Sequence, residues 1–466
     1  MITAKAFAGK HYAVLGLARS GLATVEALLA SGARVTAWDD ALFSGEGRSL
    51  GLDSGLRRRT EILDLNTADL TIFDSIVVTP GLPLNRHPIA ARARKAGVEI
   101  IGDIELFARA RAELPPHKVV GITGTNGKST TTALVHHILQ TAGVPSLMGG
   151  NIGLPILSQK PLPAGGVYVL ELSSFQIDLT HSLDCDVAVL LNITPDHLDR
   201  YESFEAYAAS KARLFDMQNI EGWKVIQTDD PLSAALQKKY FLRCPSLSHS
   251  DGTVESFHTN VLSMSGDNVQ DPRDLWDAFD ETKWHSVQAD WPSLQGRHNA
   301  QNAAAALCIS LALGVADATA AKSLETFSGL PHRMERVHET GGVLFVNDSK
   351  ATNAEAAAPA LAAYPTVRWI LGGQAKAETL GDTAKHLDHV VAAYTIGEAG
   401  PMFARLLRDA GVTVTECETL DHAVSRAAED SQAGETVLLS PASASFDQFK
   451  DFEARGDKFR LLVGAL

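Results

Sequence analysis

The chain has 466 residues, of which 45% are hydrophobic and 21% are charged, as in an ordinary globular protein. A length of this kind suits about three domains. The net charge of −14 argues against a protein that wraps nucleic acid or lies on an anionic membrane. No apolar run reaches membrane-spanning length and no signal-peptide pattern opens the chain, so we expect a cytoplasmic protein. The four cysteines lack metal-site spacing, which favours reduced core thiols.

The N-terminal part predicts a strand, a glycine turn, a helix and a second strand. The first strand covers 11–16, the turn 16–21 and the second strand 34–39, which closes with Asp39. This is the plan of a dinucleotide-binding unit, but Ala18 replaces the second glycine of the pattern. The pattern therefore leaves open NAD or another phosphate-bearing ligand.

A third strand, over 75–78, runs into the turn Thr79-Pro80-Gly81. This turn lies at the carboxyl end of the strand, where open α/β sheets bind ligands, although an ordinary proline-glycine turn is an equal alternative. The prolines at 115 and 116 mark a first domain boundary.

The next segment predicts a buried strand, a phosphate-binding loop and a helix. The loop reads Gly124-Thr125-Asn126-Gly127-Lys128-Ser129-Thr130. Gly124 and Gly127 permit a turn that directs backbone N–H groups into one concavity at a helix N-terminus. Lys128 supplies a cation for the outer phosphates, and the Ser129 hydroxyl is placed to bind Mg²⁺. Ile122 stands where the strict pattern has its first glycine, yet we interpret the segment as a triphosphate site.

Two later strands each end in polar side chains. The first, over 167–170, ends at Glu171, the usual place for a group that holds Mg²⁺ directly or through water. The second, over 186–191, leads to Asp196 and His197. Several polar groups at one strand end favour a site over a plain loop.

The remainder of this middle block is less informative. A helix over about 204–215 carries Lys211, and from spacing alone we expect a solvated lysine without a role. Residues 245–292 are polar and predict a surface excursion. Asn299 and Asn302 lie one turn apart on an alanine-rich helix, where they either cap and solvate it or contact a base or ribose.

The third block predicts another open α/β sheet with its ligand edge at the strand ends. Its expected strands cover 343–346, 368–371 and 436–439. Each strand releases a polar turn, and Lys350 and Lys376 would place cations suited to a carboxylate or phosphate on that edge. The predicted domains are 1–114, 115–328 and 329–466.

Taken together, these stretches resemble the ATP-dependent Mur ligases of peptidoglycan synthesis over essentially the whole chain. The central motifs that carry the resemblance lie at 124–130, 150–153, 171–174, 192–199 and 332–335. The closing motifs, at 347–353 and 439–449, are similar to those of the members that add D-glutamate. The Asp-Asn-Pro-Arg signature of the diaminopimelate-adding member does not occur.

The resemblance implies an α/β fold with an N-terminal Rossmann-like nucleotide-sugar domain, a central P-loop ATPase domain and a C-terminal Rossmann-like amino-acid domain. It implies an ATP- and Mg²⁺-dependent amide ligase that adds D-glutamate to UDP-N-acetylmuramoyl-L-alanine through an acyl-phosphate intermediate, with these two compounds as its small-molecule substrates. We expect a monomer that binds neither nucleic acid nor membranes.

The resemblance also implies roles for individual residues. The implied catalytic residues are Lys128, Glu171, His197, Lys211 and Lys350. The implied ATP site comprises Gly124, Thr125, Asn126, Gly127, Lys128, Ser129, Thr130, Asn299, Asn302, Arg333 and Asp348. The implied UDP-substrate site comprises Arg19, Ser20, Asp39, Gly81, Asn151 and His197. The implied D-glutamate site comprises Lys350, Thr352, Lys376, Ser445 and Phe452. The implied metal ligands are Ser129, Glu171, His197 and Lys211, the last as a carbamylated lysine.

The chain departs from the family pattern in two places. Arg19 stands where relatives often carry a small or apolar residue. The family's glycine-rich stretch usually continues Lys-Gly or Lys-Ser and then Asp-Phe, whereas this chain reads Lys376-Ala377-Glu378-Thr379-Leu380. Three rival interpretations remain: a sister Mur or folylpolyglutamate-type ligase, a nucleotide-dependent dehydrogenase, and a non-catalytic ATP-gated binding module.

Overall fold

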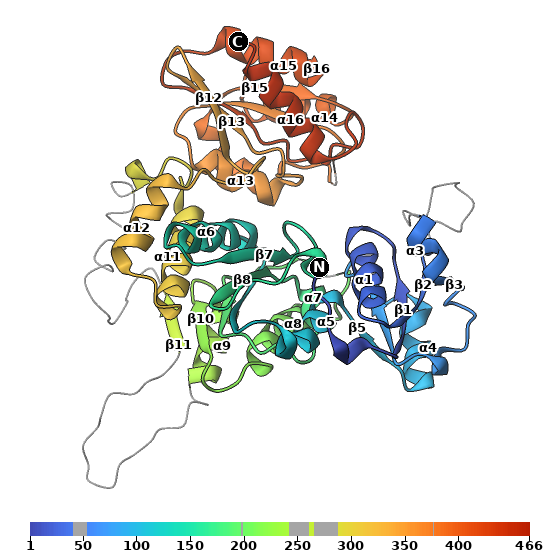
Figure 1. Ribbon diagram of the computed structural model, residues 1–466. Coiled ribbons are helices and arrows are strands. Elements are labelled where there is room, and N and C mark those ends of the chain that lie inside the picture. Colours follow the sequence, from blue (N-terminus) through green and yellow to red (C-terminus); the bar gives the residue numbers. More distant parts are fainter. Residues whose placement is uncertain (41–53, 197–198, 242–260, 265–287, 376) are drawn as a thin grey trace, which may run out of the picture. The chain divides into compact units, whose positions relative to one another are not determined.

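The computed structural model describes residues 1–40, 54–196, 199–241, 261–264, 288–375 and 377–466. Within these residues the strands form three sheets, with helices between successive strands (Figure 1). The fold is therefore α/β, as predicted. The chain forms two compact units, one of residues 1–281 and 304–323 and the other of residues 282–303 and 324–466.

The first sheet has the strand order β3-β2-β1-β4-β5, with all strands parallel. Its strands are β1 (His11–Leu15), β2 (Arg34–Trp38), β3 (Glu61–Ile62), β4 (Ser75–Val78) and β5 (Glu99–Ile101). Its helices are α1 (Arg19–Ala30), α3 (Ser54–Arg59), α4 (Pro88–Ala96) and α5 (Asp103–Ala110). The order in which the chain adds strands reverses between β1 and β4: β2 and β3 lie to one side of β1, and β4 and β5 to the other. Ligands bind at this position in such sheets.

The second sheet has the order β11-β10-β9-β6-β8-β7 and is also parallel. Its strands are β6 (His117–Thr123), β7 (Ser146–Gly150), β8 (Gly166–Glu171), β9 (Val187–Leu190), β10 (Trp223–Gln227) and β11 (Val261–Met264). Its helices are α6 (Lys128–Thr141), α7 (Ser174–Asp178), α8 (Phe204–Asp216), α9 (Pro231–Phe241), α11 (Arg297–Ala312) and α12 (Asp317–Thr326). In Figure 1, α6 covers one face of this sheet and α8 and α9 the other.

The third sheet has the order β12-β13-β17-β14-β15-β16, in which β12 alone runs antiparallel to its described neighbour. Its strands are β12 (Glu335–Thr340), β13 (Val343–Asn347), β14 (Val367–Gly372), β15 (Val390–Ile396), β16 (Val414–Glu418) and β17 (Thr436–Leu439). Its helices are α13 (Ala354–Ala362), α14 (Gly400–Asp409), α15 (Leu420–Asp430) and α16 (Phe452–Val463). Short 3₁₀ helices occur at Lys5–Phe7, Leu70–Ile72, Arg111–Glu113, Ile156–Ser158, Gln288–Asp290 and Gly381–His389.

Apolar strands explain the core of each sheet. Every residue of β1, β4, β8 and β17 is buried, because parallel strands with helices on both faces are shielded from water on both sides. The third sheet has a buried cluster on each side, one around Trp369 and the other around Tyr394. These cores hold the strand ends in fixed register, and the strand ends carry the candidate site.

The predicted strands before the phosphate loop, before Glu171 and in the third block are all present, within about two residues at either end. Each sheet lies inside one predicted domain range, and the boundaries themselves stay predictions. The expected excursion over 245–292 lies largely outside the described residues. Elements such as β7 and β16 were not predicted, because their sequences lack a sustained apolar run.

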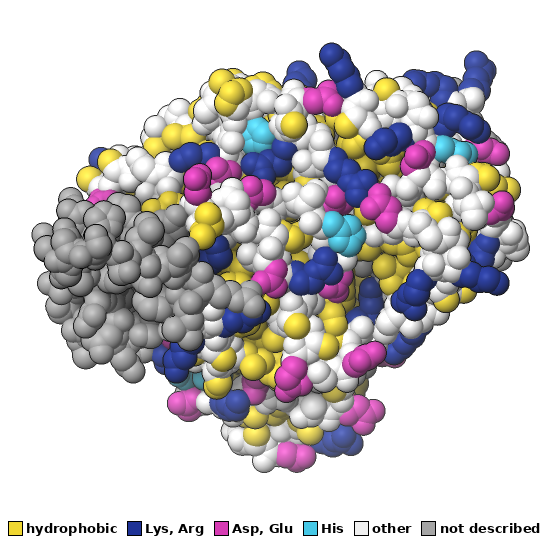
Figure 2. All heavy atoms as spheres, turned by 90° about the horizontal axis from the view of Figure 1, so that it is seen from below, with side chains coloured by type: hydrophobic (Ala, Val, Ile, Leu, Met, Phe, Trp, Pro, Cys, Tyr) yellow, Lys and Arg dark blue, Asp and Glu magenta, His cyan; other side chains and the backbone are white. Residues whose placement is uncertain are grey.

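On the face shown in Figure 2, Lys and Arg side chains are interspersed with Asp and Glu side chains over the coloured surface. Such mixing limits a large field of one sign. Among the described helices, none combines the length and the apolar character needed to cross a membrane. The expected lack of binding to nucleic acid stays a prediction.

Candidate functional site

The phosphate loop forms the predicted strand, turn and helix. β6 ends at Thr123 and α6 begins at Lys128. Gly124 has a φ of 154° and Gly127 has a φ of 84°. Residues with a Cβ rarely adopt such values. A Cβ on Gly124 would also lie 3.0 Å from the Cβ of Leu191. The two glycines thus place the loop at the N-terminus of α6, where free N–H groups and the helix dipole favour an anion.

The segment after β9 braces this loop. The carbonyl of Asn192 accepts a hydrogen bond from the Thr125 N–H (2.9 Å), and its side chain accepts from the Asn126 N–H (2.8 Å) and donates to the Asn126 carbonyl (3.2 Å). Lys128 Nζ donates to the carbonyls of Gly124 (2.9 Å) and Thr125 (2.8 Å). Its ammonium therefore lies against the loop that would hold phosphates.

Glu171 lies beside the loop because β8 pairs with β6 in a register that matches Glu171 with Ile122. Glu171 is only 2% exposed. Oε1 accepts a hydrogen bond from Asn151 Nδ2 (2.9 Å), but the buried Oε2 has no hydrogen-bond partner among the described residues. An unpaired buried carboxylate oxygen is costly, and it is also the hard ligand that Mg²⁺ prefers.

Lys211 is 1% exposed, so the expectation of a solvated lysine is wrong. Its Nζ donates to the carbonyl of Gly124 (2.9 Å) and lies 4.5 Å from the centre of the Tyr207 ring. Burial, together with the charge of Lys128, lowers the pKa of Lys211 well below its usual value. The amine therefore reaches the phosphate loop in a form that loses its proton easily.

The remaining polar strand end is described only in part. Asp196 is exposed, whereas His197 lies outside the described residues and its role stays a prediction. Among the described side chains, no group of three or more His, Cys, Asp or Glu could hold a metal ion. The predicted metal ligands are not such a group, because two of them, Ser129 and Lys211, are neither His, Cys, Asp nor Glu.

In the first sheet, the predicted nucleotide-sugar residues lie near the carboxyl ends of β1, β2 and β4. They are Arg19, Ser20, Asp39 and Gly81. Asp39 Oδ2 accepts a hydrogen bond from the Leu17 N–H (2.7 Å), which fixes the turn after β1. Arg19 Nη2 donates to the carbonyl of Gly153 (3.3 Å), beyond β7. The fold therefore gathers residues of three strand ends at the predicted edge.

In the third sheet, the motif at 332–335 forms a strained turn. His332 has a φ of 61° and Met334 a φ of 45°, values that non-glycine residues seldom adopt away from functional sites. The Met334 N–H donates to Asp348 Oδ1 (3.1 Å), and the Ser440 hydroxyl donates to Asp348 Oδ2 (2.7 Å). Arg333 Nε is buried and has no hydrogen-bond partner among the described residues. A guanidinium N–H in this state can accommodate an anion.

Asn299 and Asn302 lie beside this turn. Both are buried on α11, and Asn302 Nδ2 donates to Asn299 Oδ1 (3.1 Å). Asn299 Nδ2 donates to the carbonyl of Gln295 (3.0 Å) and contacts Met334 Sδ at 3.9 Å. The predicted polar face of the helix is therefore turned inward.

The predicted D-glutamate residues lie on the loops after β13 and β17 and at the start of α16. Lys350 Nζ lies 4.6 Å from the centre of the Phe452 ring. Ser445 is buried, and Thr352 is partly buried. Lys376 lies outside the described residues, so its role stays a prediction.

Arg455 joins these loops and was not predicted from the sequence. Its Nε donates to the Ser349 hydroxyl (3.0 Å), and Nη2 donates to the carbonyls of Ser349 (2.9 Å) and Ser443 (3.1 Å). Nη1 donates to the carbonyls of Gly372 and Ala444, each at 3.4 Å. Burial lowers the pKa of this guanidinium to about 10, so it stays charged at neutral pH. One buried cation thus holds the ends of β13, β14 and β17 together.

Replacing Arg455 with methionine is expected to lower the free energy of unfolding by about 3–5 kcal/mol, because the buried acceptors lose their donors. Urea unfolding followed by circular dichroism measures this change. Arg426→Met, on the exposed face of α15, is the control and should change stability by only about 0.5 kcal/mol or less. Equal midpoints for the two variants would contradict the prediction.

Asp348 makes stability depend on pH, since burial raises its pKa to about 7. Between the ordinary aspartate pKa of the unfolded chain and this raised pKa, the folded state binds more protons than the unfolded state. The stability from Asp348 is therefore full below about pH 4 and is lost as the pH rises through about 7. In Asp348→Asn, the difference in unfolding free energy between about pH 5 and about pH 8 should change by about 2 kcal/mol relative to the wild type. Unfolding curves with identical pH dependence would refute this.

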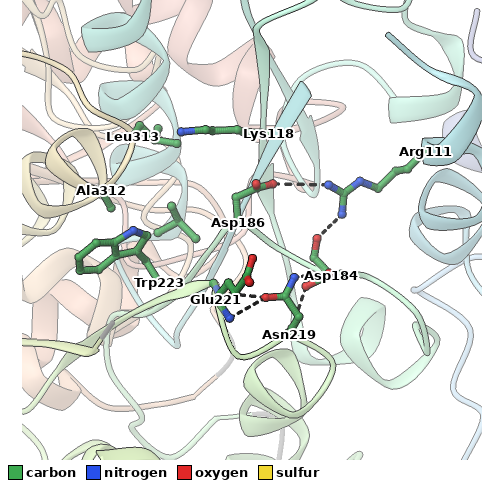
Figure 3. A pocket seen from close by; sticks show the side chains of 11 residues that line it. Arg111, Lys118, Asp184, Asp186, Asn219, Glu221, Trp223, Ala312 and Leu313 are labelled. Atoms are coloured by element: carbon green, nitrogen blue, oxygen red, sulfur yellow. Dashed lines mark hydrogen bonds and ion pairs between the residues drawn. The ribbon is translucent and has the colours of Figure 1, made fainter. Parts of the chain in front are cut away.

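A cavity of about 260 Å³ lies at the amino-terminal ends of the strands of the second sheet, opposite the edge that carries the phosphate loop (Figure 3). Arg111 borders it, donating to the carbonyl of Asp184 and pairing with Asp186. Trp223 lines the cavity from the start of β10. None of the site residues that were predicted from the sequence and that the structure describes lines this cavity.

The phosphate loop at the end of β6 and the buried acid on β8, in a chain with two further α/β sheets, define a P-loop nucleotide-dependent enzyme. The chain matches the Mur ligase MurD-like N-terminal domain over residues 10–102, the Mur ligase middle domain over 122–310 and the Mur ligase glutamate ligase domain over 332–443. The chain belongs to the Mur ligase family.

Relatives are similar over the full length. A UDP-N-acetylmuramoylalanine--D-glutamate ligase of Novosphingobium aromaticivorans is 56% identical over all of this chain and 97% of its own. One of Zymomonas mobilis is 52% identical over all of both chains. The solved Thermotoga maritima MurC is 17% identical, with a TM-score of 0.55 over 98% of this chain and 99% of its own. The T. maritima MurF ligase in complex with ADP is 18% identical, with a TM-score of 0.55 over 99% and 97%. These two structures share the fold.

Proposed function

We propose that this chain is an ATP-dependent ligase that adds D-glutamate to UDP-N-acetylmuramoyl-L-alanine in peptidoglycan precursor synthesis. The observation that carries the proposal is the full-length similarity to relatives that bear this name. The phosphate loop and the unpaired Oε2 of Glu171 support the ATP-dependent step.

The chemistry requires two like charges to meet, the substrate carboxylate and the γ-phosphate of ATP. A carboxylate oxygen attacks the γ-phosphorus, which yields an acyl phosphate and ADP. The amine of D-glutamate then attacks the acyl carbon and forms a tetrahedral intermediate. When this intermediate collapses, phosphate leaves together with the carboxylate oxygen that had attacked the γ-phosphorus, and the amine nitrogen loses a proton. Lys128 and the N–H groups of the loop would lower the repulsion in the first step.

The residues present suit Mg²⁺, because Ser129 and Glu171 offer oxygen atoms and Glu171 Oε2 lacks a partner among the described residues. We propose His197 and carbamylated Lys211 as the remaining ligands. When bound, Mg²⁺ would neutralise charge on the transferring phosphoryl group.

Lys211 fits carbamylation for a physical reason. Only a neutral amine adds CO₂, and burial lowers the pKa of Lys211 well below its usual value. The product, a carbamate, is an anion at position 211 of α8, one helical turn after Tyr207 and beside the phosphate loop. We propose that this anion replaces an unfavourable buried cation with a metal-binding group.

The other ligands would lie at the remaining strand ends. Arg333, Asp348, Asn299 and Asn302 are proposed to contact ATP. Arg19, Ser20, Asp39, Gly81, Asn151 and His197 are proposed to contact the UDP substrate. Lys350, Thr352, Lys376, Ser445 and Phe452 are proposed to surround D-glutamate. A monomeric state and a cytoplasmic location stay predictions.

An isotope experiment tests the acyl-phosphate route. UDP-N-acetylmuramoyl-L-alanine labelled with ¹⁸O in its carboxylate should yield inorganic phosphate that carries one ¹⁸O atom, as read by mass spectrometry, and a product heavier by one glutamyl residue. Unlabelled phosphate would contradict activation by phosphorylation. Labelled phosphate formed only with a different amino acid would indicate a sister ligase.

A further inference from the structure

Arg200 connects the second sheet to the turn that follows β4. Its Nη2 donates to the carbonyl of Leu82 (2.8 Å), and Nη1 lies 3.5 Å from the carbonyl of Gly81. A parallel contact joins the neighbouring backbone, since Asn85 Nδ2 donates to the carbonyl of Asp199 (3.0 Å). The turn that carries one proposed UDP-substrate contact is thus tied to the polar segment after β9.

The same guanidinium stacks on the segment after Glu171. Arg200 Cζ lies 4.2 Å from the centre of the Phe175 ring, and Phe175 stacks on Tyr201 with ring centres 5.9 Å apart and planes 11° apart. Phe175 belongs to α7, which begins three residues after Glu171. The planar guanidinium therefore uses its edge for carbonyls and its face for an aromatic ring, a combination that lysine lacks.

The contacts continue to the helix that carries Lys211. The Tyr201 hydroxyl donates to Asp178 Oδ2 (2.8 Å), and the Ser210 hydroxyl donates to Asp178 Oδ1 (2.7 Å). Ser210 immediately precedes Lys211 on α8. A continuous set of contacts thus runs from the turn after β4, through Arg200, to both proposed metal-binding segments.

We propose that Arg200 is a positioning residue that couples binding of the UDP substrate to binding of ATP. An occupied turn after β4 would hold its carbonyls where Arg200 meets them, and Arg200 would then fix α7 and α8 around the phosphate loop. Reciprocally, ATP bound at the loop favours the arrangement that holds the turn. This inference rests on the proposed function, since it takes the turn after β4 as part of the UDP-substrate site.

The test measures affinity for UDP-N-acetylmuramoyl-L-alanine by calorimetry, with Mg²⁺ present and with or without a non-hydrolysable ATP analogue. In the wild type, the analogue should tighten binding about 10-fold. In Arg200→Ala the enhancement should fall to about 2-fold or less, and Arg200→Lys, which keeps the charge, should recover little of it. Arg59→Ala is the matched control, because Arg59 Nη2 also donates to a backbone carbonyl, that of Leu29 (2.9 Å), which belongs neither to the turn nor to the contacts around Asp178. It should keep the wild-type enhancement.

A wild-type enhancement that persists in both Arg200 variants would overturn the inference, as would the absence of any enhancement in the wild type. Circular dichroism verifies that the variants fold, and the lysine variant serves if the alanine variant does not. Failure of the wild type to bind UDP-N-acetylmuramoyl-L-alanine at all would overturn the proposed function as well. The two failures are therefore distinguishable.

Discussion

Replacing Lys211 with alanine is expected to lower kcat by roughly 10²- to 10³-fold, the loss seen when one preorganised electrostatic group is removed from a reacting centre. The physical reason is the position of Nζ, 2.9 Å from the carbonyl of Gly124 in the phosphate loop. Steady-state phosphate release measures the effect. Lys238→Ala, at an exposed position on α9, is the control and should keep the wild-type rate. A fully active Lys211→Ala would remove Lys211 from the mechanism.

The same residue gives a test of the carbamate itself. Carbamate formation is reversible and needs CO₂, so wild-type activity should decline during incubation in CO₂-free buffer and return when bicarbonate is added. Lys211→Ala should show no such response. Wild-type activity that is indifferent to CO₂ would leave Lys211 in the site but contradict carbamylation.

Replacing Glu171 with glutamine is expected to lower kcat by roughly 10²-fold and to raise the Mg²⁺ concentration needed for half-maximal rate. The amide keeps the shape and an acceptor for Asn151, but it removes the negative charge at Oε2. Stability should not fall, because the oxygen that changes has no hydrogen-bond partner among the described residues. Rates over a Mg²⁺ titration, together with urea unfolding, measure both effects.

Glu105 provides a matched control for Glu171, since it is equally buried but fully hydrogen-bonded. Its carboxylate accepts from Arg109 Nε (2.8 Å), from the N–H groups of His181 (2.7 Å) and Ser182 (2.9 Å), and from the Ser182 hydroxyl (2.8 Å). Glu105→Gln should therefore lose about 1–3 kcal/mol of stability and keep its Mg²⁺ dependence. The opposite pattern in the two variants would contradict the assignment of Glu171 as a metal ligand.

Much of the fold could be predicted because parallel strands between helices are short, apolar and followed by polar turns. β6, β8 and β13 were recognised for this reason, and so was Glu171 at a strand end. β12 escaped prediction because it is an exposed, antiparallel edge strand whose residues, such as His338 and Glu339, show no apolar run. Edge strands carry little burial signal.

The two charged residues that spacing alone missed share one property. Lys211 lies on the buried stripe of α8 with Tyr207 and Phe215, and Arg455 lies on the buried stripe of α16 with Phe459 and Val463. Each charge occupies an i, i+4, i+8 series of otherwise apolar positions, so its burial could have been noticed. The partners could not, because Gly124 and Ser349 are distant in sequence and only the tertiary fold brings them near.

The most direct test of the central claim is phosphate release from ATP in the presence of UDP-N-acetylmuramoyl-L-alanine, with one amino acid added at a time. We predict release only with D-glutamate, together with a product heavier by one glutamyl residue. Release driven by a diamino acid or by D-alanyl-D-alanine, or release independent of any amino acid, would contradict the account.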